Sequence, residues 1–147
     1  MRAIDHFIVG GTGGGASGRM GDVFDPNSGA VQAQVPLGGK AELDKAVAAA
    51  KGAQPAWAAT NPQRRARVMF EFKRLVEASI DELAHLLSSE HGKVIADARG
   101  DVQRGLDVIE FACGIPHAMK GEYTEGAGPG IDVYSMRTAL GIGAGIT

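Results

Sequence analysis

The stretch Leu140-Gly141-Ile142-Gly143-Ala144-Gly145-Ile146-Thr147 is apolar, rich in small residues and free of charge. Such a run is typical of a central strand in a parallel sheet, which helices cover on both faces. The sequence therefore predicts an α/β fold with a buried strand at residues 140–147. A parallel neighbour would need a crossover of about a dozen or more residues. Because the sequence stops at Thr147, we expect this chain to be the front part of a larger protein.

Upstream of this stretch, the spacing of apolar residues predicts about four helices. The first is expected to run from about Lys40 to Gly52, with an apolar stripe on one face. The second has a strong start signal, because Asn61 is a good N-cap residue and Pro62 suits the first helical position.

The third and fourth helices follow without a long loop between them. Ser79 and Glu82 have the spacing of a capping box, and Gly92 is expected to end the third helix. Apolar residues at intervals of three and four predict the fourth helix, and these are Ile95, Ala98, Val102, Leu106, Ile109 and Cys113. Gly114 and Pro116 are expected to end it.

Short strands are predicted at both ends of this helical region. His6–Val9 should form the first strand, and the turn residues Asp25–Gly29 should join two strands of a hairpin. Residues 121–130 are predicted to be a glycine-rich loop. An exposed strand is expected after the loop, over residues 132–138.

Composition excludes several classes of function. The chain holds 15 Lys and Arg against 17 Asp and Glu, which gives a formal net charge of −2. This balance does not suit a nucleic-acid or membrane-surface partner. The one basic cluster, Arg64-Arg65-Ala66-Arg67, is expected to be a solvated face or a subunit contact. No stretch approaches the ~20 apolar residues of a membrane span. The single cysteine and the absence of a secretory apolar segment at the N-terminus predict a cytoplasmic location.

Two motifs resemble functional sites, but local structure accounts for each of them better. Gly13–Gly18 matches the glycine pattern of dinucleotide-binding loops, which needs a helix immediately after it. The residues that follow do not form a helical pattern, so we interpret the match as a glycine-rich turn. Cys113 lies on the apolar stripe of the fourth helix, where a buried and unreactive thiol is expected. The four histidines lack the spacing of metal ligands, and no metal site is predicted.

Arg104 is the strongest candidate for a ligand contact. It lies off the main apolar stripe of its helix, on a face shared with Asp101, Val108 and Phe111. One interpretation is an ion pair from Asp101 to Arg104 on the helix surface. The other follows from the apolar neighbours, which suggest a second buried face. An arginine in that setting requires a carboxylate or phosphate partner.

Several longer motifs resemble the aldehyde dehydrogenase superfamily, and within it the methylmalonate-semialdehyde dehydrogenase branch, which acylates coenzyme A. The strongest matches are Glu90–Lys93, Gly100–Leu106 and Ile109–His117. Further segments that fit are Asp22–Pro26, Trp57–Arg67, Lys120–Tyr123, Tyr134–Arg137 and Ala144–Thr147. The resemblance covers essentially the whole chain from residue 6.

The resemblance implies a homo-oligomeric enzyme whose subunit is about three times the length of this chain. A cysteine thiolate attacks the semialdehyde carbonyl in that branch, and hydride then passes to NAD. The resulting thioester loses carbon dioxide, and coenzyme A accepts the acyl group to give propionyl-CoA or acetyl-CoA.

Two site residues can be transferred from the resemblance. Arg104 matches the arginine that meets the substrate carboxylate, and Thr147 matches a residue whose backbone begins the NAD contact. The nucleophilic cysteine and the general-base glutamate of the branch would lie beyond residue 147, so Cys113 is not that nucleophile.

The resemblance also implies how the chain is divided. Residues 1–125 would be the hairpin and helical part, residues 126–139 a loop and oligomerisation strand, and residues 140–147 the start of the NAD-binding domain. A stand-alone oligomerisation module without catalysis is the alternative.

Overall fold

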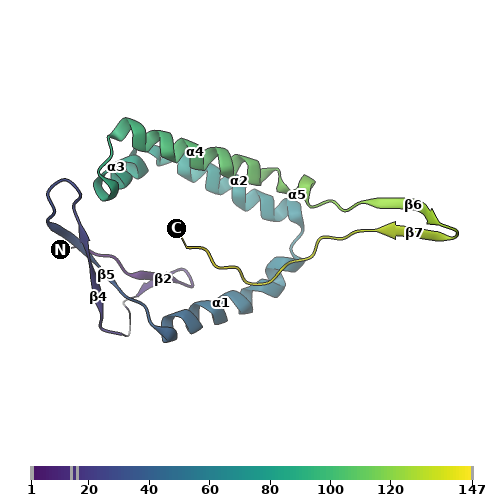
Figure 1. Cartoon of the computed structure of the whole chain (residues 1–147), viewed down its shortest axis with the longest axis horizontal. Helices are drawn as coiled ribbons and strands as arrows, with labels where there is room; N and C mark the ends of the chain where they lie inside the picture. Colours follow the sequence, from purple (N-terminus) through teal and green to yellow (C-terminus); the bar gives the residue numbers. More distant parts are fainter. Residues whose placement is uncertain (1, 14, 16, 147) are drawn as a thin grey trace.

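The computed structural model of the chain describes residues 2–13, 15 and 17–146, and within them it shows an open α/β arrangement. Two helices, α2 (Pro62–Ala78) and α4 (Ile95–Cys113), lie side by side, with α3 (Ile80–His91) at one end (Figure 1). The helix α1 (Lys40–Ala59) lies apart from this group and contains no buried residue. The one-turn helix α5 (Ile115–Ala118) follows α4. The α/β fold class is therefore confirmed.

The strands form three small sheets. In the first, β5 (Val31–Pro36) lies between β1 (Arg2–Ala3), which runs parallel to it, and β4 (Met20–Phe24), which runs antiparallel. The second is the hairpin of β2 (His6–Ile8) and β3 (Gly11–Gly13). The third is the hairpin of β6 (Tyr123–Gly128) and β7 (Ile131–Tyr134), which projects from the body as an arm (Figure 1).

Local sequence signals explain most of these elements. The predicted turn between β4 and β5 is confirmed, and within it Asn27 donates its backbone N–H to the carboxylate of Asp25 at 2.8 Å. This hydrogen bond lowers the pKa of Asp25 below its ordinary value. Asn61 caps α2 as predicted, because its side chain accepts the N–H of Gln63 at 2.9 Å.

Two details of the helices differ from the sequence-based expectation. The first helix continues through Pro55 to Ala59, although the proline ring removes one backbone hydrogen bond. The predicted capping box of α3 is wrong, because Ser79 makes no side-chain cap bond. The backbone N–H of Ser79 instead donates to the carbonyls of Leu75 and Val76 at the end of α2. This serine is therefore the C-cap of α2 and directly precedes α3.

Two predictions near the C-terminal end of the chain are also wrong. The glycine-rich loop at residues 121–130 contains the strand β6, which pairs with β7. Residues 139–146 do not form a strand, and Leu140 and Ile146 are fully exposed. A strand requires a hydrogen-bonded neighbour, and none of the described strands pairs with this segment. Gly141, at φ +115°, also interrupts extended backbone there.

The two segments that enter and leave the arm approach each other closely at its base. The backbone N–H groups of Glu122 and Ser135 bind across this base, each at 2.9 Å from its acceptor. A Cβ on Gly121 would meet the carbonyl oxygen of Ser135, so only glycine fits at this position.

The core of the described part of the chain is small. Its buried hydrophobic residues are Ala33, Ala66, Ala84, Ala98, Leu106 and Cys113. Four of them lie on α2, α3 and α4 as alanine or cysteine, which lets these helices approach closely. Cys113 is buried as predicted. No described helix is long and apolar enough to cross a bilayer.

The turn between α3 and α4 generates a stability prediction. Gly92 ends α3 in the left-handed conformation (φ +80°), and a Cβ there would lie 3.1 Å from the ring of Pro26. We expect Gly92→Ala to destabilise the chain by about 1–3 kcal/mol through backbone strain and this contact. Thermal unfolding followed by circular dichroism measures the effect.

Gly105→Ala is the matched control. Gly105 lies within α4, and no neighbouring atom would contact its Cβ within 4 Å. Alanine should therefore stabilise the helix by about 0.5–1 kcal/mol. Equal effects from the two substitutions would contradict the role assigned to Gly92.

Candidate functional site

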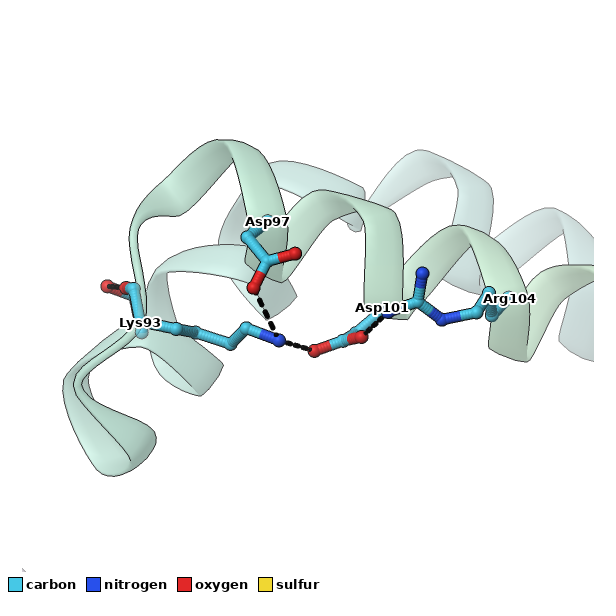
Figure 2. Close-up of polar contacts among 5 residues, drawn as sticks. Lys93, Asp97, Asp101 and Arg104 are labelled. Atoms are coloured by element: carbon cyan, nitrogen blue, oxygen red, sulfur yellow. Dashed lines mark hydrogen bonds and ion pairs between the residues drawn. The ribbon is translucent and has the colours of Figure 1, made fainter.

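The candidate site lies where the turn after α3 meets the first half of α4. Gly92 turns the chain against Pro26, and the hydroxyl of Ser88 donates to the carbonyl of Lys93 at 2.6 Å. These two contacts fix the backbone of Lys93. The side chain of Lys93 then runs alongside the first turns of α4 (Figure 2).

Four charged side chains form a row along this edge of α4, which we call the α4 charge row. It consists of Asp97, Lys93, Asp101 and Arg104, in that spatial order (Figure 2). The Nζ of Lys93 lies 2.9 Å from Oδ2 of Asp97 and also contacts Oδ2 of Asp101. The other carboxylate oxygen of Asp101 accepts from Nη2 of Arg104. The charges alternate, so the row as a whole is neutral.

Burial differs sharply along the row. The side chains of Lys93 and Asp101 are 19% and 31% exposed, whereas those of Asp97 and Arg104 are 58% and 69% exposed. The inner pair is thus the sheltered part of the row. Arg104 extends from it into solvent and makes no other hydrogen bond within the described residues. Its remaining N–H groups can bind a carboxylate ligand.

The ion pairs shift the pKa of the two inner groups in opposite directions. The hydrogen bond to Asp101, followed by that to Asp97, raises the pKa of Lys93 above its ordinary value. The hydrogen bond from Lys93, followed by that from Arg104, lowers the pKa of Asp101. Both groups are therefore charged throughout the neutral pH range.

Both interpretations of Arg104 remain consistent with this geometry. The predicted ion pair with Asp101 is present. The second apolar face of α4 also exists, although Val108 and Phe111 are exposed among the described residues. The contact between Arg104 and a substrate carboxylate stays a prediction. Thr147, the predicted NAD contact, lies outside the described residues.

A hollow near Phe111 is less suited to an anionic ligand. It measures about 540 Å³ and is lined by Asp107, Glu110, Phe111, Gly114, Ile115 and Ala118. Two carboxylates in this lining would repel a substrate carboxylate. Arg104 is thus the better candidate on this helix for an anion contact.

The remaining sequence candidates are placed as follows. The glycine pattern at residues 13–18 leads into the strand β4 and not into a helix. Of the basic cluster, Arg64 and Arg67 are exposed, and Arg65 is half-buried with Nη2 3.8 Å from the sulfur of Met119. Among the described residues, no group of three or more His, Cys, Asp or Glu could hold a metal ion.

Sequence reasoning missed the part that Lys93 plays in the site. Lys93, Asp97 and Asp101 are spaced four residues apart, and such spacing places charges on one edge of a helix. The pattern was therefore present in the sequence. It was obscured because Gly92 ends one helix immediately before Lys93, and the lysine itself lies outside α4.

Comparison with known proteins places the chain in a family. A sequence model of the aldehyde dehydrogenase family matches residues 14–147. A crystal structure described as a methylmalonate-semialdehyde dehydrogenase from Sinorhizobium meliloti, complexed with NAD, superposes with a TM-score of 0.93 at 56% identity. It covers 97% of this chain, which spans 29% of that one. The methylmalonate-semialdehyde dehydrogenase DddC from Oceanimonas doudoroffii gives a TM-score of 0.89 at 41% identity over 94% of this chain and 28% of its own.

A curated relative gives the same result. The malonate-semialdehyde dehydrogenase of Pseudomonas aeruginosa is 42% identical over 142 residues, which is 97% of this chain and 29% of that protein. The chain thus spans less than a third of the length of the relatives it matches. Since the family match extends over all but the first 13 residues, the chain belongs to the aldehyde dehydrogenase family.

Proposed function

We propose that this chain is the N-terminal part of an NAD-dependent, coenzyme A-acylating dehydrogenase of malonate or methylmalonate semialdehyde. The observation that carries the proposal is the 56% identity, over 97% of the chain, to a protein described as a methylmalonate-semialdehyde dehydrogenase. The solvent-open guanidinium of Arg104 supports it, because this substrate class carries a carboxylate in addition to its aldehyde.

Arg104 performs the recognition step in this proposal. Its guanidinium binds the substrate carboxylate through N–H groups that Asp101 leaves free. A charge-assisted hydrogen bond of this kind contributes about 1.5–3 kcal/mol. Fixing the carboxylate end of a short semialdehyde also fixes the direction of its carbonyl, which assists attack by a nucleophile outside this chain.

The described residues do not by themselves form a site for NAD or coenzyme A. Residues 139–146 are extended and exposed, and the glycine pattern at residues 13–18 lacks the helix that holds a pyrophosphate. The proposal gives this chain a role in substrate recognition only.

A second candidate function is supported by the arm. The strands β6 and β7 project from the body (Figure 1). Four large side chains on them are exposed, namely Tyr123, Ile131, Val133 and Tyr134. A two-stranded ribbon keeps unpaired hydrogen-bonding groups along both outer edges. In this alternative, the chain is an oligomerisation module without catalysis.

A substrate-specific effect is expected for Arg104 in the complete dehydrogenase that contains this chain. Arg104→Ala should lower kcat/KM for malonate or methylmalonate semialdehyde by roughly 10- to 200-fold, the equivalent of the lost charge-assisted bond. Propionaldehyde, which has no carboxylate, should be affected less than about threefold. Steady-state NADH formation measures both substrates.

Arg99→Ala is the matched control, since Arg99 also lies on α4 and pairs with a carboxylate, that of Asp81. It should leave the ratio between the two substrates unchanged. An equal loss for charged and uncharged aldehydes in Arg104→Ala would show that Arg104 is only structural, and would refute the recognition role.

The isolated 147-residue chain should have no dehydrogenase activity. Its single cysteine is buried in α4, where it cannot reach a substrate carbonyl. The assay is NADH formation from malonate semialdehyde, NAD and coenzyme A at high protein concentration. Turnover that persists after repurification, and is lost in Cys113→Ala, would contradict this expectation.

The isolated chain should also self-associate in the micromolar range. Apolar side chains on the arm and on residues 140–146 are exposed, and such surfaces favour association. Sedimentation velocity should show dimers or larger species, which Val133→Lys on β7 should weaken. Val94→Lys, at an exposed position away from the arm, is the control. A monomer at every concentration would refute the oligomerisation role.

A further inference from the structure

Asp101 is the only member of the α4 charge row that contacts both cations. Its Oδ2 binds Nζ of Lys93, and its Oδ1 binds Nη2 of Arg104. It is also one of the two sheltered members of the row, at 31% side-chain exposure. The carboxylate is thus held at both oxygens, which fixes its orientation on the helix.

Arg104 is in the opposite situation. Its side chain is 69% exposed, and the contact with Asp101 is its only hydrogen bond within the described residues. A free arginine side chain samples many rotamers, and holding it in one costs conformational entropy. The contact with Asp101 orders the Arg104 side chain before a ligand binds, so binding does not have to supply this entropy. This contact uses Nη2 of Arg104 and leaves the other N–H groups of the guanidinium available to a ligand.

The ion pair with Lys93 determines whether Asp101 strengthens or weakens the binding of an anionic ligand to Arg104. An aspartate bound to Arg104 alone would cancel the charge that the ligand needs. Here the charge of Asp101 is shared with Lys93, which is the least exposed member of the row at 19%. Arg104 therefore keeps part of its charge for a ligand while its orientation is set by the aspartate.

We infer that Asp101, held by Lys93, is a positioning residue that presents Arg104 to the carboxylate of the semialdehyde substrate. This inference rests on the recognition role proposed above for Arg104. Asp101 and Lys93 do not touch the substrate in this arrangement. They act through the guanidinium, and their effect is confined to substrates that carry a carboxylate.

The test uses the complete dehydrogenase with Asp101→Asn, which keeps the shape of the side chain and removes its charge. We expect KM for malonate or methylmalonate semialdehyde to rise about five- to tenfold, which corresponds to the rotamer freedom that Arg104 regains. The KM for propionaldehyde should change less than about twofold, since this substrate has no carboxylate for the guanidinium to bind. Asp101→Glu should recover part of the loss, because it restores the carboxylate.

Asp107→Asn is the matched control for charge alone. Asp107 lies three residues after Arg104 on α4, as Asp101 lies three before it, but it pairs with Gln103 at 2.9 Å. Removing a negative charge near an anion site should by itself lower KM. Of these two Asp→Asn variants, the positioning role predicts a rise in KM only for Asp101→Asn.

Two further variants test the route through Arg104. Lys93→Met should also raise KM for the carboxylate-bearing substrates, because Asp101 then engages Arg104 alone. In an Arg104→Ala background, Asp101→Asn should cause no additional change in KM. An added change in that background would show that Asp101 acts independently of Arg104, and would overturn the inference.

The outcomes separate this inference from the proposed function. If Arg104→Ala discriminates between charged and uncharged aldehydes but Asp101→Asn leaves KM unchanged or lowers it, only the positioning role is refuted. If Arg104→Ala fails to discriminate, the recognition role is refuted and the positioning role with it. A loss of all activity in Asp101→Asn leaves Lys93→Met to decide, since an unchanged KM in that variant overturns the inference.

Discussion

The structure depends on small side chains where its helices meet. Ala66 of α2, Ala84 of α3 and Ala98 of α4 are buried at these contacts. Larger side chains there would push the helices apart or force strain elsewhere. Because α4 is held in this way along one side, its opposite edge presents Asp97, Asp101 and Arg104 at fixed intervals. The recognition site proposed here is therefore a consequence of how closely these helices pack.

The same helices leave much apolar surface uncovered. Phe70 and Phe72 of α2 and Val108 and Phe111 of α4 are exposed, and α1 buries no residue among those described. Large apolar side chains left exposed in this way are typical of a surface that contacts other protein. It agrees with a chain that spans less than a third of the length of its relatives. In the full-length subunit proposed above, these faces are where the remaining domains are expected to pack.

Local chemistry made most of the helical region predictable, and tertiary context explains the failures. The Asn61 cap and the left-handed Gly92 follow from residue types whose conformational preferences are strong. Residues 140–146 carry a strand-like pattern but do not form a strand, because a strand requires a neighbour that the described residues do not supply. The Arg104 ion pair was predictable from its spacing to Asp101, whereas the second partner of Asp101, Lys93, reaches it from beyond the start of the helix.

The tight base of the β6–β7 arm has a mechanical consequence. Gly121 allows the two segments to touch there, and the bonds between Glu122 and Ser135 join them, so a tilt at this base would be shared by both strands. A strand of the length of β6 reaches roughly 20 Å from that pivot. A tilt of about 10° at the pivot then carries the tip through roughly 3–4 Å, by the same geometry. The end of α5 lies just before this pivot. A small shift of the helices would thus be amplified at the tip of the arm.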